Sequence, residues 1–327
     1  MENKEIIRVE GLKKYFPVRN FWGGHKAYVK AVNGVSFSIY EGETFGLVGE
    51  SGCGKSTLGR TIIRMLEPSA GKLFFRDKDI TKGRYEALRE AQNKMQIIFQ
   101  DPYSSLNPYW TVEEILDEPL RKSEFTATQK RERKELLLEK VGMHVEDLKK
   151  FPYEFSGGQR QRIGIARALM LNPDFIFCDE PIAALDVSIQ AQVVNLLEDL
   201  QQEFGLSYLF AAHDLSMVKY VSHRIAVMYL GKIVELSPSK ELYENPRHPY
   251  TIALLSAVPI ADPQLAAKQD RIRLTGEIPS PLAEINGCSF APRCPYAQDL
   301  CRGKVPEFRE FSTGHLLACH FAEEIAD

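Results

Sequence analysis

The chain has 327 residues, 44% of them hydrophobic and 26% charged, as in an ordinary folded globular protein, and this length allows two domains. Its 41 Lys and Arg residues against 44 Asp and Glu give a formal net charge of −3, which does not favour a polyanion such as DNA as the main partner. The sequence contains no run of eighteen or more apolar residues, so no membrane span is predicted. The start Met1–Glu5 is charged and has no apolar segment of the signal-peptide type, so we expect a cytosolic protein.

Short apolar runs separated by polar segments fill the first hundred residues. They predict buried strands at Val35–Ile39, Thr44–Val48, Lys72–Phe75 and Met95–Phe99. Glu41-Gly42 is the predicted turn between the first two strands. The segment Leu58–Leu66 continues as a helix. Further on, Ala127–Val141 carries leucines at helical spacing among Lys, Arg and Glu, and we interpret this charge run as a solvated helix face.

The second half of the chain has the same alternation. Strands are predicted at Phe175–Cys178, Tyr208–Ala212 and Arg224–Tyr229. Between the first two, an apolar stripe from Ile189 to Phe204 predicts a helix, with Gly205 as its C-terminal cap. Strands separated by helices predict a mostly parallel sheet that helices cover.

A phosphate-binding pattern lies between the strand that ends at Val48 and the following helix. The sequence Gly49-Glu50-Ser51-Gly52-Cys53-Gly54-Lys55-Ser56-Thr57 matches G-x-x-x-x-G-K-[ST], the P-loop. Glycines let successive backbone N–H groups meet phosphate oxygens at the positive end of the helix. Lys55 can then reach the β- and γ-phosphates, and Ser56 can ligate Mg²⁺. A glycine-rich turn is the alternative, but the flanking strand and helix favour binding of a nucleoside triphosphate.

Four further polar features follow the P-loop in fixed order. They are Gln100 after the strand Met95–Phe99, the glycine turn Phe155-Ser156-Gly157-Gly158-Gln159 before a helix predicted at Gln161–Met170, the pair Asp179-Glu180 after Phe175–Cys178, and His213 after Tyr208–Ala212. The Asp179 carboxylate can hold Mg²⁺ through water, because this ion retains much of its hydration. Glu180 can orient or deprotonate an attacking water molecule.

This ordered set resembles the ATP-binding-cassette (ABC) ATPases, whose signature is [LF]-S-G-G-Q, over about Ile6 to Glu244. The resemblance implies an α/β fold: a P-loop NTPase (RecA-like) core with antiparallel β and helical subdomains, the helical one at about 103–170. It implies an ATPase with Glu180, His213 and Gln100 as catalytic residues. Mg²⁺ would be bound through Ser56, Gln100 and Asp179. The implied ATP contacts of the same chain are Phe16, Gly49, Ser51, Gly52, Cys53, Gly54, Lys55, Ser56 and Thr57.

The resemblance also implies a dimer, because in the family the signature contacts the ATP bound on the other subunit. The implied contacts in trans are Ser156, Gly157, Gly158 and Gln159, and the loop at Asp186 touches the opposite subunit. Phe16 has the register of the ring that stacks on adenine, and Tyr15 is the alternative. One departure is Ile182-Ala183, where members usually carry a small polar pair; neither position touches phosphate.

Prolines and cysteines become dense after residue 245, so we predict an ATPase domain at 1–245 and a smaller domain at 246–327. The run Asn245-Pro246-Arg247-His248-Pro249-Tyr250-Thr251 resembles the C-terminal extension of the oligopeptide/dipeptide (and nickel) importer ATPases, through Cys319. This resemblance implies a peripheral protein at the cytoplasmic face of the cell membrane, with no nucleic acid as partner. Its implied partners are a related but different ATPase chain, two transmembrane permease subunits and, indirectly, an extracytoplasmic substrate-binding protein.

Four of the six cysteines lie in this tail, in the order Cys288, Cys294, Cys301 and Cys319. A cytosolic location disfavours disulfides, and the spacing lacks the C-x₂-C pairs usual for structural zinc. Four thiolates suit a 4Fe–4S cluster, which some relatives of this branch carry. We therefore predict such a cluster, with Zn²⁺ and free buried thiols as alternatives. Cys53 and Cys178 are poor ligand candidates, since one lies in the P-loop and the other in a core strand.

Three functions remain to be compared. The first is ATP hydrolysis that powers import of dipeptides or oligopeptides, or of nickel or another small solute. The second is a non-transport ABC ATPase of DNA repair or translation, which predicts long insertions, a tandem cassette or a basic surface that this sequence lacks. The third is a binding module without catalysis, which the presence of Lys55, Asp179, Glu180 and His213 disfavours.

Overall fold

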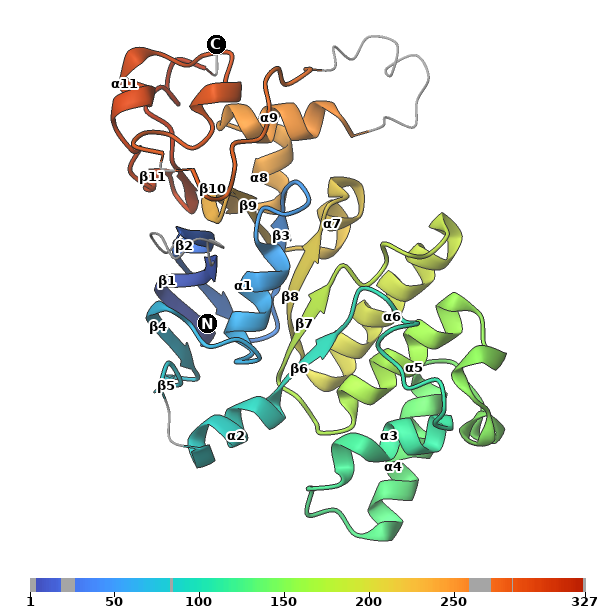
Figure 1. Ribbon diagram of the computed structural model, residues 1–327. Helices are drawn as coiled ribbons and strands as arrows, with labels where there is room; N and C mark the ends of the chain where they lie inside the picture. Colours follow the sequence, from blue (N-terminus) through green and yellow to red (C-terminus); the bar gives the residue numbers. More distant parts are fainter. Residues whose placement is uncertain (1–3, 19–26, 83–84, 259–271, 284, 326–327) are drawn as a thin grey trace. The chain divides into compact units, whose positions relative to one another are not determined.

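The computed structural model describes residues 4–18, 27–82, 85–258, 272–283 and 285–325 (Figure 1). The chain forms two compact units, each built from several segments. The first comprises Met1–Ile7, Ile39–Glu43 and Phe74–Phe210, and the second comprises Arg8–Ser38, Thr44–Leu73 and Ala211–Asp327. The domain boundary that the sequence places between residues 245 and 246 stays a prediction.

The second unit contains the strand that leads into the P-loop. This strand, β3 (Thr44–Val48), pairs in parallel with β9 (Arg224–Tyr229), and Val48 lies opposite Val227. All five residues of β3 are buried, which explains their unbroken apolar character. Three antiparallel strands continue beyond β9 in the order β10, β12, β11; their bounds are β10 (Lys232–Pro238), β12 (His315–Leu317) and β11 (Arg309–Ser312).

The helices of the second unit are short. They are α1 (Lys55–Ile62), α7 (Leu215–Val221), α8 (Ser239–Glu244), α9 (Pro249–Ser256), α11 (Asp299–Gly303) and the 3₁₀ turn η3 (Ala291–Arg293). Three strands of a smaller sheet, in the order β2, β1, β4, also lie largely in this unit; their bounds are β2 (Ala27–Tyr40), β1 (Glu5–Val18) and β4 (Ala70–Phe75). The whole of β1, and most of β2, escaped prediction because these long strands mix polar and apolar residues.

A buried carboxylate ties the C-terminal segment to β10. Glu235 is fully buried, and its two oxygens accept hydrogen bonds from the backbone N–H groups of Arg247 (2.8 Å) and His248 (3.1 Å). The Nε2 atom of His315 lies 2.7 Å from the same carboxylate. Buried charges need such partners, so this cluster fixes where the chain leaves the sheet and begins the cysteine-containing tail.

The first unit contains a parallel pair of strands, and helices lie between its strands in the sequence. The strands β6 (Met95–Ile98) and β7 (Phe175–Asp179) pair in parallel, and β8 (Ser207–Ala212) follows β7 in the sheet order. The predicted apolar stripe is confirmed in α6 (Val187–Phe204), whose buried side chains include Val193, Leu197 and Leu200. Gly205 caps this helix in the left-handed conformation, with φ of 65°. The short hairpin strand β5 (Lys78–Asp79) and helix α2 (Tyr85–Lys94) complete the β-side of the unit.

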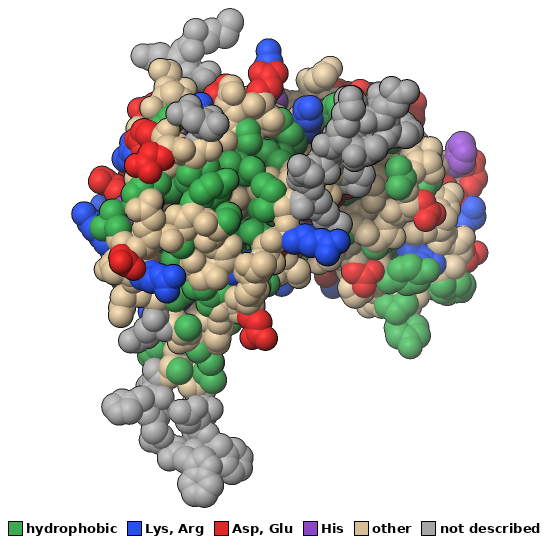
Figure 2. All heavy atoms as spheres, turned by 90° about the horizontal axis from the view of Figure 1, so that it is seen from above, with side chains coloured by type: hydrophobic (Ala, Val, Ile, Leu, Met, Phe, Trp, Pro, Cys, Tyr) green, Lys and Arg blue, Asp and Glu red, His purple; other side chains and the backbone are tan. Residues whose placement is uncertain are grey.

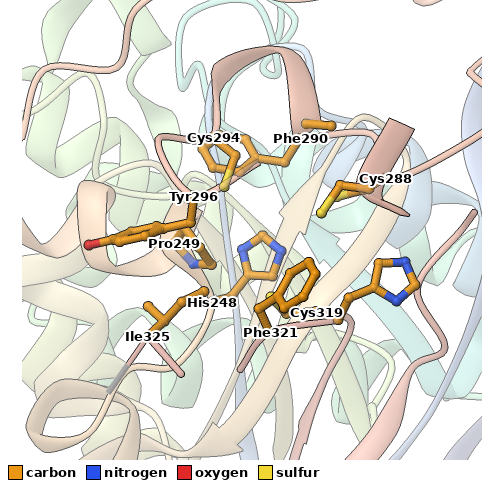
Figure 3. A pocket seen from close by; sticks show the side chains of 12 residues that line it. His248, Pro249, Cys288, Phe290, Cys294, Tyr296, Cys319, Phe321 and Ile325 are labelled. Carbon is orange, nitrogen blue, oxygen red and sulfur yellow. The ribbon is translucent and has the colours of Figure 1, made fainter. Parts of the chain in front are cut away.

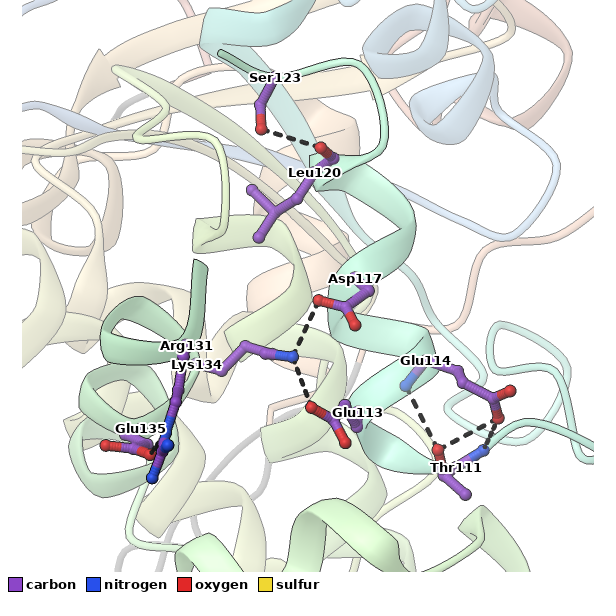
Figure 4. A network of polar contacts seen from close by, with 9 residues as sticks. All are labelled: Thr111, Glu113, Glu114, Asp117, Leu120, Ser123, Arg131, Lys134 and Glu135. Carbon is purple, nitrogen blue, oxygen red and sulfur yellow. Dashed lines mark hydrogen bonds and ion pairs between the residues drawn. The ribbon is translucent and has the colours of Figure 1, made fainter. Parts of the chain in front are cut away.

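The helical part of the first unit packs three helices against one another: α3 (Val112–Leu120), α4 (Ala127–Lys140) and α5 (Gly157–Leu169). The 3₁₀ turns η1 (Val145–Lys149) and η2 (Pro152–Glu154) lie between α4 and α5. The predicted solvated face of α4 is wrong at one position. Lys134 is 5% exposed, and its Nζ forms ion pairs with Glu113 (2.7 Å) and Asp117 (3.0 Å) of α3 (Figure 4).

Charged side chains of both signs are interspersed on the face of the molecule that Figure 2 shows, in keeping with the balanced composition. Within the described ranges, each helix is too short or too polar to cross a lipid bilayer.

Candidate nucleotide-binding site

Two P-loop glycines are required by contacts with neighbouring backbone. A Cβ atom on Gly49, whose φ is 153°, would lie 2.2 Å from the carbonyl oxygen of Met228 at the end of β9. A Cβ atom on Gly54, whose φ is 111°, would lie 2.1 Å from the carbonyl oxygen of Ala31. Both positions exclude any side chain, so the loop is pressed against strands β9 and β2.

Lys55, the first residue of α1, lies inside the loop. Its side chain is 4% exposed, and Nζ donates to the carbonyl oxygens of Gly49 (2.8 Å) and Glu50 (3.3 Å). These two carbonyl oxygens hold the ammonium group within the loop. Gly54, the N-cap of α1, has no side chain that could cap the helix. The N-terminus of α1, with its positive partial charge and adjacent ammonium, is therefore suited to an anion.

The middle of the P-loop is fixed by the turn between β9 and β10. The N–H of Gly231 donates to the carbonyl oxygen of Cys53 at 2.8 Å. Cys53 is 5% exposed, and burial raises the pKa of its thiol. A buried thiol packs like a small apolar side chain.

The two candidate rings for adenine differ in their surroundings. Tyr15 is tied down: its Oη donates to Oδ1 of Asn33 at 2.5 Å, and its N–H donates to Oγ of Ser69 at 2.9 Å. Phe16 is 36% exposed, and its ring lies 5.0 Å from the Nζ of Lys14. The Phe16 ring is thus the more exposed of the two, and an exposed ring has a flat apolar face on which a ligand can stack.

The first unit brings two predicted catalytic residues together. Nε2 of Gln100 donates to Oε2 of Glu180 at 3.1 Å. Asp179 ends strand β7 and is fully buried, whereas Glu180 is partly exposed and has φ of 47°. The left-handed backbone region is costly for a non-glycine residue and is found preferentially at functional sites. It turns the Glu180 side chain away from the strand direction and toward Gln100.

The signature turn begins α5 four residues earlier than the sequence predicts. Ser156 is the N-cap: its Oγ accepts from the N–H of Gln159 (3.3 Å), and Oε1 of Gln159 accepts from the N–H of Ser156 (3.0 Å). This capping box places both glycines in the first helical turn. A Cβ on Gly158 would lie 2.6 Å from Ile189 of α6, so this glycine also has a packing role, whereas a Cβ on Gly157 would only touch Leu185 at 3.6 Å.

Most of the remaining predicted site residues lie in exposed turns, and two lie in helix α1. His213 is exposed and directly follows β8. Asp186, also exposed, is the N-cap of α6, and the turn before it is held by Nε2 of Gln190, which donates to the carbonyl oxygens of Ile182 and Leu185. Ser51 and Gly52 are exposed at the tip of the P-loop, and Ser56 and Thr57 are half-buried in α1.

The four tail cysteines line one small pocket of about 20 Å³. Figure 3 shows Cys288, Cys294 and Cys319 around this space, together with Phe290 and Phe321. All four thiols are free, and the N–H of Cys288 donates to the carbonyl oxygen of Cys301 at 2.8 Å. Burial raises the pKa of Cys294 and of Cys319 to about 11, so these thiols are neutral at pH 7 without a metal.

The tail therefore gathers its cysteines without forming a ready site for a single ion. Across the described residues, no three His, Cys, Asp or Glu side chains are arranged to hold a metal ion. The tetrahedral geometry that zinc requires is thus not preformed among these residues. In chemical terms, four thiols around one pocket are the donor set of a thiolate-bound iron–sulfur cluster.

Sequence reasoning missed the residues that join the tail to the P-loop. The guanidinium of Arg293 donates from its two terminal nitrogens to the Glu50 carboxylate, at 2.8 and 3.0 Å, and these bonds raise the pKa of Arg293. Oη of Tyr250 accepts from the N–H of Glu50 at 2.9 Å. Tyr250 lies 200 positions and Arg293 lies 243 positions from Glu50 in the chain, and no local sequence pattern pairs residues so far apart.

Comparisons with known proteins agree with this geometry. The family model described as "ABC transporter" matches residues 32–183, and that described as "Oligopeptide/dipeptide transporter, C-terminal region" matches residues 234–301. Among solved structures, cbiO1 of Clostridium perfringens, part of an ABC transporter complex, aligns with a TM-score of 0.64 and 27% identity over 74% of this chain and 92% of its own. An ATP-binding cassette solved as a dimer with ADP and phosphate aligns with a TM-score of 0.62 and 26% identity, over 71% and 98%.

Relatives of similar length are more alike in sequence. The oligopeptide transport ATP-binding protein AppF of Bacillus subtilis is 52% identical over 96% of this chain and 97% of its own. The dipeptide transport ATP-binding protein DppF of Haemophilus influenzae is 46% identical over 97% of both. The chain therefore belongs to the ABC transporter family, in the branch of oligopeptide and dipeptide transport ATP-binding proteins.

Proposed function

We propose that this chain binds and hydrolyses ATP and thereby powers the import of dipeptides or oligopeptides across a membrane. The observation that carries the proposal is the buried Lys55 in a P-loop pressed against β9, in a chain 52% identical to an oligopeptide transport ATP-binding protein. The C-terminal match to the oligopeptide/dipeptide transporter region supports peptides over nickel or another solute.

Each residue then has a defined task in hydrolysis. Lys55 and the N–H groups at the start of α1 bind the β- and γ-phosphates. Glu180 takes a proton from water as the new bond from water oxygen to the γ-phosphorus forms, and the bond from that phosphorus to the oxygen of ADP breaks. The hydrogen bond from Gln100 to Glu180 orients the carboxylate. His213 donates a hydrogen bond to the γ-phosphate.

Mg²⁺ neutralises phosphate charge when it is bound. Ser56, Gln100 and Asp179 would hold it, since a hydroxyl, an amide carbonyl and a carboxylate form the all-oxygen donor set that this ion prefers. The exposed ring of Phe16 is proposed to stack on adenine, because the hydroxyl of Tyr15 is engaged by Asn33.

The cassette is proposed to act as a dimer in a larger assembly. Ser156, Gly157, Gly158 and Gln159 would contact ATP on a second ATPase subunit, and Ser156 and Gln159 are exposed. The proposed partners are a related but different ATPase chain and two transmembrane permease subunits, with an extracytoplasmic binding protein acting through them. The chain would then lie peripherally at the cytoplasmic face of the membrane.

Reconstitution tests this function. The chain and the membrane subunits that co-purify with it are placed in proteoliposomes, and uptake of a radiolabelled tripeptide is followed with and without ATP. We expect ATP-dependent uptake that is lost when Glu180→Gln replaces the wild-type chain. Nickel uptake without peptide uptake would assign the alternative solute, and ATP hydrolysis unaffected by any permease would contradict the transport role.

We further propose that the segment 246–327 is a separate domain whose Cys288, Cys294, Cys301 and Cys319 hold a 4Fe–4S cluster. The shared pocket of the four thiols supports this (Figure 3). Such a cluster would cross-link a tail with little core of its own. Anaerobically purified protein should be brown, with about four iron and four sulfide per chain. Cys301→Ser should bleach it and Cys53→Ser should not; one zinc per chain, or no metal, would contradict the cluster.

A further inference from the structure

The Glu50 carboxylate belongs to the phosphate-binding loop, where a negative charge opposes ATP. The ammonium of Lys55 lies 3.3 Å from the backbone oxygen of Glu50, so the side chain of Glu50 is within a Debye length, about 10 Å, of any phosphate that Lys55 binds. A free carboxylate here would repel the triphosphate and would also compete with it for Lys55.

Arg293 forms a bidentate salt bridge with this carboxylate. Its terminal nitrogens lie 2.8 and 3.0 Å from Oε2 and Oε1 of Glu50, the parallel geometry in which guanidinium and carboxylate bind most strongly. The Arg293 side chain is 8% exposed and that of Glu50 is 26% exposed, so water screens the pair only in part. The pair directs the charge of Glu50 away from Lys55.

Arg293 is itself held on an aromatic platform. Its Cζ lies 5.9 Å from the ring centre of Tyr229, at the end of β9, and that ring packs at 4.7 Å from Tyr250 and 5.3 Å from Phe290. Tyr250 in turn accepts the N–H of Glu50. Both the backbone and the side chain of Glu50 are thus held by residues of the C-terminal segment, Tyr250 and Arg293. Arg293 packs on Tyr229 of β9, the same strand whose Met228 carbonyl oxygen lies against Gly49.

We propose that Arg293 is a positioning residue of the ATP site, which keeps the Glu50 carboxylate from opposing the phosphates and from capturing Lys55. The C-terminal segment then contributes directly to ATP affinity. Phe290, three residues before Arg293, lines the cysteine pocket, so the segment that holds the thiols also holds this arginine. The proposal rests on ATP binding by this chain.

A double-mutant cycle on the full-length chain tests it. Affinity is measured with a fluorescent ATP analogue at low and high salt, first on the wild type; absence of binding there would refute the proposed function, not this inference. Arg293→Met should weaken ATP binding about tenfold at low salt and less at high salt. Glu50→Gln should bind at least as well as the wild type. The double variant should recover wild-type affinity, because the charge that needed pairing is gone.

Controls separate positioning from folding. Arg309→Met removes another arginine–carboxylate pair of the tail, with Glu323 at 2.5 Å, and should leave affinity unchanged. Arg293→Lys, which keeps the charge but not the fork, should recover part of the affinity. Thermal unfolding is recorded for every variant. If the double variant binds as weakly as Arg293→Met, or if Glu50→Gln alone weakens binding tenfold, the inference is wrong; if Arg293→Met does not fold, Glu50→Gln and Arg293→Lys still decide.

Discussion

The P-loop and the signature turn are both glycine-containing turns at the start of a helix, and they are built in opposite ways. In the P-loop, Gly49 and Gly54 are excluded from carrying side chains by backbone contacts, and Lys55 is buried. In the signature, Ser156 is exposed and caps its own helix, and Gly157 would tolerate a Cβ.

This difference concerns how the N-terminus of each helix is satisfied. The P-loop holds the Lys55 ammonium, lacks a capping side chain at Gly54 and is braced from β9 and the C-terminal segment, so the N-terminus of α1 is suited to an anion. The signature helix satisfies its N-terminal groups with its own residues Ser156 and Gln159. A phosphate from a second subunit would have to compete with this capping box, which suits a contact that forms and breaks in each cycle.

The largest expected effect separates chemistry from binding. Glu180→Gln should lower the rate of ATP hydrolysis about 10²- to 10⁴-fold, because the amide keeps the bond with Gln100 but cannot take a proton. ATP affinity, measured by equilibrium dialysis, should stay within the range of the wild type. Hydrolysis at the wild-type rate would remove Glu180 from the role of general base.

The next variant tests the signature in trans. Gly157→Asp places a carboxylate in the first turn of α5 and should lower hydrolysis about a hundredfold, as loss of a charge-stabilising donor does in other enzymes. Gly164→Asp, on the same helix and also without close neighbours, is the matched control.

In a mixed dimer, the chain carrying Gly157→Asp should silence the ATP site of its partner and spare its own. If the two chains hydrolyse ATP independently of each other's signature, the signature does not act on the ATP site of the partner, and the prediction is wrong.

A smaller effect is expected from the P-loop cation. Lys55→Ala should weaken ATP binding about 10- to 100-fold, since a hydrogen bond to a charged group contributes roughly 1.5–3 kcal/mol. Lys140→Ala, which removes a half-exposed ion pair with Glu203, is the control. Calorimetric titration with ATP measures both. Unchanged affinity of Lys55→Ala would show that the loop backbone alone binds the phosphates.

The smallest effect concerns the helices that carry the signature. Lys134→Met should lower the free energy of unfolding by about 1 kcal/mol, because it leaves Glu113 and Asp117 unpaired, but both carboxylates are about half exposed and water compensates most of the loss. Lys122→Met, at an exposed site after α3, is the control. Urea unfolding gives the difference, and ATP affinity of the P-loop should not change; a loss of affinity would show that the two regions are coupled.

The sequence by itself was sufficient for features whose cause is local. The strand β3, the helix α6 and its Gly205 cap follow from apolar periodicity and glycine geometry, and the structure has them where they were predicted. The P-loop and the strand-end residues Gln100 and Glu180 were predicted because ATP hydrolysis requires fixed residue types at fixed spacing. The structure joins Gln100 to Glu180 by a hydrogen bond, and the roles of both residues stay predictions. The same patterns gave the family, which the relatives confirm.

Only the tertiary structure decided features that join distant parts of the chain within one unit. The charge run of α4 gave no sign that Lys134 is buried, since a helix pattern does not reveal which charges another helix will cover. The start of α5 at Gly157 depends on the capping box of Ser156 and Gln159, which the two glycines obscured. The pair of Arg293 and Glu50 forms because β9, the P-loop and the tail are neighbours in the folded chain. A contact between residues so far apart in the chain produces no periodic pattern in the sequence, so it could not be predicted from it.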